Sequence, residues 1–102
     1  MFRLTVVYPS APEAHFDFDY YVTSHIPMVA SLIGDSVIKT EVAKGIAGGD
    51  GGPAPYHAIG HLYLTNLEGL QAAFAIHLPA IAADLAKYTN IAPVINIDEI
   101  IP

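Results

Sequence analysis

The sequence predicts an α+β fold: two β-α-β halves forming a four-stranded antiparallel sheet with both helices on one face. Three observations carry this prediction: four short strand-like runs, two segments with apolar residues at helical spacing, and a weak internal repeat. The chain has 102 residues, a length that suits one domain. We therefore expect residues 1–102 to form a single domain.

The predicted strands are short runs rich in β-branched and apolar residues, bounded by proline- or glycine-containing segments. In the second of them, strict alternation would put Ile38, Thr40 and Val42 on one face. Between the second and third strands, residues 45–55 hold five glycines and two prolines, which predicts a long connection. The four predicted strands are residues 2–8, 37–44, 56–65 and 94–100.

Each predicted helix begins after a residue that can cap it, Asp17 in the first half and Asn66 in the second. Apolar residues then recur at helical spacing, and Pro27 and Pro79 should kink their helices because proline removes a backbone donor. The first apolar stripe is Phe18, Tyr21, Val22, His25, Val29 and Leu32; the second is Leu67, Leu70, Phe74, Leu78, Ile81 and Leu85.

The two halves echo each other at an offset of 52 residues, because His25-Ile26-Pro27 corresponds to His77-Leu78-Pro79. Two such halves packed side by side give the ferredoxin-like βαββαβ plan. In this plan the helices cover one face of the sheet and leave the other bare.

Composition predicts an oligomer or a ligand-filled cavity, and of the two it favours the oligomer. Hydrophobic residues make up 53% of the chain and charged residues 14%, which is more apolar surface than a monomer of this size hides easily. A homodimer is the simplest oligomer, and closure of two bare sheet faces on each other would bury the excess.

Charge and cysteine content exclude several classes of function. The formal net charge is -6, and the few basic residues are scattered, so we expect no nucleic-acid partner and no attraction to anionic membranes. No apolar run approaches the roughly 20 residues of a membrane span. The chain has no cysteine, which excludes thiolate chemistry. No secretory signal precedes the first strand, so the expected location is cytoplasmic.

His25 is the first candidate for chemistry, because it lies on the apolar stripe of the first helix close to Tyr21. A histidine there could act as a general acid or base. Alternatively, it could be a buried histidine that fixes the helix against the sheet. The echo at His77 favours this structural role, since a repeated residue suggests a repeated packing role.

The third strand carries more polar candidates. Alternation puts Ala58, Gly60, Leu62 and Leu64 on one face, which suits helix packing. The opposite face, which we expect to line a cavity between two subunits, carries His57, Ile59, His61 and Tyr63. The alternative is that His57 is exposed near the loop, while His61 and Tyr63 satisfy each other across a dimer interface.

The histidines do not predict a metal site. His57 and His61 lie four residues apart on one strand, about 13 Å at 3.3 Å per residue, whereas metal–nitrogen bonds are near 2 Å. No phosphate-binding loop or zinc-protease signature is present. We expect no metal and no cofactor.

Three stretches resemble the EthD family: Phe16 to Tyr21 followed by His25-Ile26-Pro27-Met28, the loop Gly45 to Tyr56, and Tyr88-Thr89-Asn90-Ile91 before Pro93-Val94-Ile95. The resemblance implies a homodimer of the dimeric α+β barrel type. It also implies kinship with bacterial catabolic clusters. Relatives on this fold include cofactor-free monooxygenases, lactone isomerases and aromatic cyclases or dehydratases.

Two hypotheses for function remain open. The first is a cofactor-independent enzyme, of oxidoreductase or isomerase/lyase type, that acts on a small apolar or aromatic compound in a cavity of the dimer. Its catalytic residues would be His25, His61 and Tyr63, and its substrate-binding residues Tyr21, His57, Ile59 and Tyr88. The second is a non-catalytic accessory or small-ligand-binding module of a degradation pathway.

Overall fold

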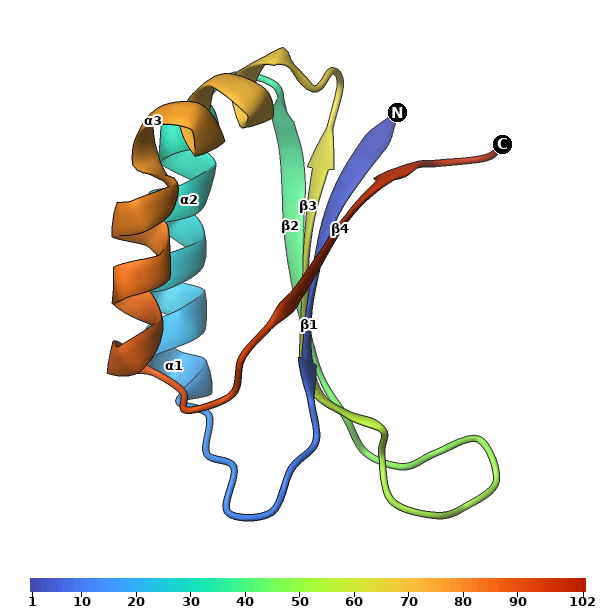
Figure 1. Ribbon diagram of the computed structural model, residues 1–102. Helices are drawn as coiled ribbons and strands as arrows, with labels where there is room; N and C mark the ends of the chain where they lie inside the picture. The colour runs from blue at the N-terminus through green and yellow to red at the C-terminus, as the bar shows by residue number, and fades with distance from the viewer.

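The helices lie on one face of a four-stranded sheet in the computed structural model, which describes residues 1–102 (Figure 1). The strand order is β2-β3-β1-β4, and every neighbouring pair is antiparallel. The strands are β1 (Phe2–Pro9), β2 (Val37–Lys44), β3 (Tyr56–Leu64) and β4 (Val94–Glu99). The helices are α1 (Phe18–Tyr20), α2 (Ile26–Ile33) and α3 (Glu68–Asp84). This is the predicted α+β ferredoxin-like arrangement.

The first predicted helix is built from three pieces. Asp17 caps it as expected, accepting the Tyr20 backbone N–H at 3.0 Å. A π turn, Tyr21–His25, then joins α1 to α2, and Pro27 follows in the first turn of α2, where a missing N–H is tolerated. The extra residue in the π turn rotates Val22 away from the core, so its predicted place on the apolar stripe is wrong: Val22 is 49% exposed.

Strand β2 contains an irregularity that the alternation did not predict. The pairing of β2 with β3 shifts between Val37 and Lys39, so that Val37 lies opposite Leu64. The bulge displaces Ile38, which is 48% exposed. The prediction that Ile38 shares a face with Thr40 and Val42 is therefore wrong, because one extra residue reverses the alternation locally.

The core lies between the helices and the sheet. On β3, Ala58, Leu62 and Leu64 are at most 1% exposed, which confirms the predicted helix-packing face of this strand. The helices contribute Tyr21, Ile26, Val29, Ile33, Leu70, Ala73 and Ile81 to the same cluster.

The opposite side of the sheet, which we call the open face, carries no helix (Figure 1). The strand pairings arrange its residues in three rows across β2, β3, β1 and β4. The first two rows are polar and the third is apolar. The rows are Lys39-Tyr63-Arg3-Asp98, Glu41-His61-Thr5-Asn96 and Ala43-Ile59-Val7-Val94.

One helical stretch, Glu68–Lys87, is long and apolar enough to span a membrane by length and composition alone. This contradicts the expectation that no apolar run approaches that length. Leu70, Ala73 and Ile81 of α3 are buried in the core, and core helices of soluble proteins meet the same criterion.

Candidate functional site

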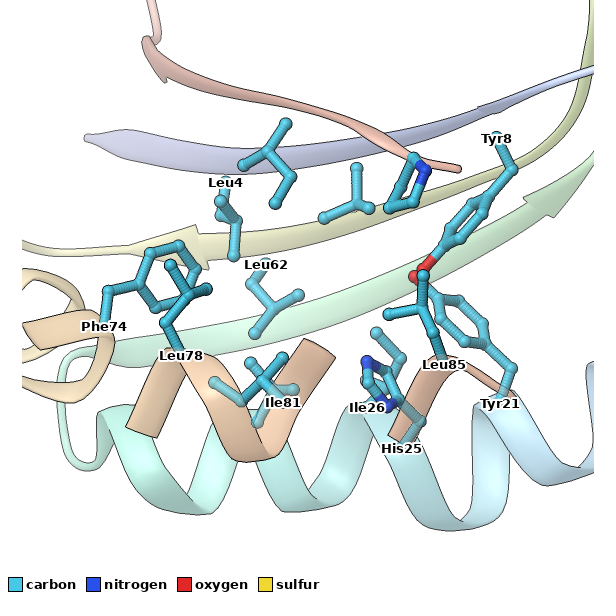
Figure 2. Close-up of a pocket in the computed structure, with 14 residues that line it drawn as sticks. Leu4, Tyr8, Tyr21, His25, Ile26, Leu62, Phe74, Leu78, Ile81 and Leu85 are labelled. Carbon is cyan, nitrogen blue, oxygen red and sulfur yellow. The ribbon is translucent and has the colours of Figure 1, made fainter. Parts of the chain in front are cut away.

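A small cavity lies between the helices and the sheet, within one chain (Figure 2). Its volume is about 40 Å³. Its wall is apolar except for two tyrosines and one histidine. The lining residues are Leu4, Val6, Tyr8, Tyr21, His25, Ile26, Val29, Leu62, Phe74, Leu78, Ile81, Leu85, Pro93 and Ile95.

His25 is held at this wall by a carboxylate from the other helix. Its Nδ1 lies 2.9 Å from Asp84 Oδ2, and the two side chains are only 5% and 12% exposed. The other oxygen of Asp84 accepts the Tyr20 hydroxyl at 2.9 Å, and Lys87 Nζ is 3.6 Å away. Both helices therefore contribute to fixing the imidazole.

The carboxylate sets the tautomer of His25. Burial would raise the pKa of Asp84, but the hydrogen bonds from His25 and Tyr20 outweigh it and hold this pKa below its usual value. An ionised carboxylate only accepts hydrogen bonds, so Nδ1 of His25 carries the proton. In the neutral imidazole, Nε2 is then a free lone pair, and it has no hydrogen-bond partner in the protein.

Three buried tyrosines surround this histidine. The hydroxyls of Tyr8 and Tyr88 are 2.8 Å apart, and the Tyr21 ring stacks on His25 at 5.5 Å between centroids and 14° between planes. Burial raises the pKa of all three hydroxyls, so they stay neutral and keep their protons at physiological pH. The site therefore combines one base with neutral hydrogen-bond donors.

Gly60 of β3 allows Tyr21 to lie this close to the sheet. A Cβ at Gly60 would come within 2.2 Å of the Tyr21 hydroxyl oxygen. Any larger residue would therefore displace the ring that stacks on His25.

The sheet divides the predicted site residues into separate groups. Tyr21 and His25 line the cavity. Tyr88 contacts both of them through its ring, at 5.1 and 4.7 Å between centroids. His57, at the loop end of β3, stacks on Phe18 with 6.1 Å between centroids.

The remaining three predicted residues, Ile59, His61 and Tyr63, lie on the open face and do not line the cavity. This cavity is inside one chain, and it is distinct from the cavity between two subunits that the sequence predicts.

The open face has its own polar network. The Thr5 hydroxyl donates to Asp98 Oδ2 at 2.8 Å and lies 3.2 Å from His61 Nδ1. Because the single hydroxyl proton goes to the carboxylate, His61 Nδ1 must be the donor to Thr5. Burial, and secondarily the charge of Arg3, lowers the pKa of His61.

Tyr63 is the second polar residue of this network. Its hydroxyl donates to Glu41 at 2.7 Å, and Lys39 Nζ lies 4.6 Å from the centre of its ring. The polar groups of the open face are therefore tied to one another across all four strands.

Sequence reasoning missed Asp84 and Tyr8. Asp84 lies 59 positions from His25, and no local pattern marks it as that residue's partner. Tyr8 closes the first strand, and the sequence predicts it only as a core residue with a polar tip.

The two histidines of the internal repeat, His25 and His77, have different surroundings. His77, the counterpart of His25, does not line the cavity and is only partly buried. The equivalence in sequence is therefore not an equivalence of environment. The structure brings together no group of three or more histidine, aspartate or glutamate side chains that could hold a metal ion.

Comparison with known proteins matches the EthD domain over residues 10–92. The crystal structure of an EthD-like protein from Ralstonia eutropha JMP134 is 35% identical, has a TM-score of 0.89, and is matched over 99% of this chain and 92% of that one. Among curated proteins, none is similar enough to count as a match.

Two more distant structures share the fold. An ethyl tert-butyl ether D (EthD) family protein from Bacillus halodurans C-125 is 24% identical, with a TM-score of 0.70 and 99% of each chain covered. A protein from Bacteroides fragilis NCTC 9343, described as dimeric with a ferredoxin-like fold, is 12% identical, with a TM-score of 0.54 and 97% and 95% of the chains covered. With the domain match spanning most of its length, the chain belongs to the EthD family.

Proposed function

We propose that this protein is a cofactor-independent enzyme of isomerase or lyase type that acts on a small apolar or aromatic compound bound in the cavity between helices and sheet. The observation that carries the proposal is the His25–Asp84 pair, 2.9 Å apart, at the wall of an otherwise apolar cavity. Buried histidines with a fixed tautomer are suited to proton transfer.

The roles follow from the hydrogen bonds. With Nδ1 bound to Asp84, His25 offers Nε2 as a base that takes a proton from the ligand and later returns it. A hydroxyl of Tyr8 or Tyr21, both of which stay neutral, donates to the ligand oxygen and stabilises negative charge that develops there. Asp84 balances the charge of the imidazolium formed in between.

A second candidate function is a non-catalytic ligand-binding module. It is favoured by the tight contacts of His25, which stacks on Tyr21 and pairs with Asp84 as a purely structural histidine would. Under either function the cavity of about 40 Å³ encloses only part of an aromatic ligand, since benzene occupies a cavity of roughly 150 Å³.

We also propose that two copies associate through the open face. A two-fold axis parallel to the strands places β2 of one copy over β4 of the other, and β3 over β1. In the first row Lys39 would then meet Asp98 of the second copy, and in the third row Ile59 would meet Val7. An axis perpendicular to the strands would instead place Glu41 against Glu41 of the second copy. It would also place the polar first row against the apolar third row.

The family membership supports a setting in small-molecule degradation, since the Bacillus relative carries the name ethyl tert-butyl ether D. We also propose a cytoplasmic location, in keeping with such a setting. Acid–base chemistry is favoured over the oxidoreductase alternative because the cavity offers a proton acceptor and hydroxyl donors.

The test compares two histidines of the same motif. The full chain is screened by NMR against uncharged compounds of up to about ten heavy atoms, and compounds that perturb cavity residues are assayed for turnover. His25→Gln should abolish turnover, whereas His77→Gln, outside the cavity, should retain it. Turnover that survives His25→Gln refutes the catalytic role, and binding without turnover of any compound favours the binding module.

A further inference from the structure

The cavity has one polar end. Its polar side chains are Tyr8, Tyr21 and His25, while the rest of the wall is formed by aliphatic residues, Phe74 and Pro93. Figure 2 shows these three together, with Phe74 and Leu78 at the far end of the cavity. A ligand must therefore be polar at one end only.

The polar end is also the deep end. Tyr8, Tyr21 and His25 are at most 4% exposed. Leu78 of α3 and Ile95 of β4, which border the cavity elsewhere, are 40% and 47% exposed. A molecule too large for the enclosed volume would thus place its polar group deep and its apolar part toward Leu78 and Ile95.

No cation lines the cavity. Arg3 and Lys39 belong to the open face, Lys44 lies over the ring of Phe18, and the Lys87 side chain is 66% exposed beside Asp84. If His25 became protonated, Asp84 would already balance its charge. A ligand carboxylate would therefore be buried without a counter-ion, which is unfavourable.

The hydrogen-bonding groups at the deep end are one acceptor and one kind of donor. His25 Nε2 accepts, because Nδ1 holds the proton. The Tyr8 hydroxyl is hydrogen-bonded to the hydroxyls of both Tyr88 and Tyr21, so three protons serve two bonds and one proton is left to donate. A ligand that satisfies both sides must donate once and accept once.

We propose that the cavity selects uncharged alcohols or phenols, with the ligand hydroxyl donating to His25 Nε2 and accepting from a tyrosine hydroxyl. A ketone would accept only, leaving Nε2 unpaired in a buried site. A hydrocarbon would leave both groups unpaired. This inference rests on the proposed function and names the substrate class of the same cavity.

The experiment measures binding of phenol, toluene and benzoate to the full chain by NMR titration. Toluene replaces the hydroxyl with a methyl group, and benzoate replaces it with a carboxylate. We expect phenol to bind at least tenfold more tightly than either. Equal affinities of phenol and toluene, or benzoate binding as tightly as phenol, overturn this inference while leaving a ligand-binding cavity. If none of the three binds, the proposed function fails with it.

Two variants locate the selectivity. His25→Phe should bring the affinity for phenol down to that for toluene. Tyr8→Phe, which removes only a hydroxyl and keeps the ring, tests the donor side should the first variant fail to fold. If the ratio of phenol affinity to toluene affinity is unchanged in Tyr8→Phe, and also in His25→Phe when that variant folds, phenol binds elsewhere. That result overturns the assignment.

Discussion

The imidazole of His25 and the carboxylate of Asp84 meet at 2.9 Å, joining the end of the π turn to the last residue of α3. The contact links the two helices at the point where they border the cavity. It also determines which nitrogen of His25 carries the proton, so one carboxylate serves both packing and the chemistry proposed for the site.

Asp84 should make the stability of the fold depend on pH. Its pKa is lowered in the folded protein, so the unfolded chain takes up its proton at a higher pH, near the usual value of about 3.9. The stabilisation is therefore complete above that value and is lost as the pH falls through the lowered, folded-state pKa. We expect the free energy of unfolding of Asp84→Asn to fall less between pH 5 and pH 3 than that of the wild type.

Denaturant titrations at each pH measure this difference. The control is Asp35→Asn, at an exposed position between α2 and β2, which should keep the pH dependence of the wild type. Parallel curves for Asp84→Asn and the wild type would mean that the His25–Asp84 pair contributes no net stability.

Leu62 and His61, neighbours on β3 that face opposite sides of the sheet, should respond differently to truncation. Leu62 is 1% exposed and lines the cavity, so Leu62→Ala should cost about 2 to 5 kcal/mol of unfolding free energy. His61→Ala should leave the protomer nearly as stable and phenol binding within about twofold, but weaken self-association through the open face.

Denaturation, NMR titration and sedimentation of the two variants separate these effects. If His61 is a site residue, as the sequence predicts, His61→Ala should instead weaken phenol binding. If His61→Ala loses phenol affinity while its self-association is unchanged, the site lies on the open face.

Features that depend on one element alone could be predicted from the sequence. The burial of Ala58 and Leu62 could be predicted because strand alternation is a property of β3 itself. The exposure of Ile38 could not, since the bulge depends on how β2 pairs with β3. Asp84 was missed for the same reason: its partner is chosen by the packing of α3 on the first helix.

The cavity within the chain could not be predicted from periodicity either. Alternation separates the faces of a sheet, but it does not say which face keeps unfilled space. Here the space depends on side-chain packing around Phe74, Leu78 and Ile95, which come from two elements. Tyr21 and His25, which line the cavity, were selected because both lie on the apolar stripe of the first predicted helix.

Engineered cysteines can test the proposed dimer on a clean background, because the chain has no cysteine. Lys39 and Asp98 lie on β2 and β4, the two edge strands, about 14 Å apart at 4.8 Å per strand. A disulfide between them within one chain is thus excluded. Lys39→Cys combined with Asp98→Cys should give an oxidised dimer at twice the 10.9 kDa of the chain.

The matched control combines Lys39→Cys with Val94→Cys, which uses the same two strands but the first and third rows. Non-reducing electrophoresis should show much less dimer for this pair. Equal crosslinking of both pairs would argue against an axis parallel to the strands, and light scattering that gives a stable monomer at micromolar concentration would refute the dimer.

Gly60 and Tyr21 should be coupled across the interface of helix and sheet. Gly60→Ala brings a methyl group within 2.2 Å of the Tyr21 hydroxyl oxygen, and Tyr21 is fully buried, so its ring cannot move out freely. Overpacking of this kind costs about 1 to 3 kcal/mol.

The ring carbons nearest the new Cβ are 3.2 and 3.3 Å away, a distance that small shifts can absorb. Tyr21→Phe should therefore recover part of the stability lost in Gly60→Ala, and a double-mutant cycle measures the coupling. If the effects of the two substitutions are additive, the Tyr21 ring does not lie against Gly60. The stacking of this ring on His25 at the cavity wall would then be contradicted as well.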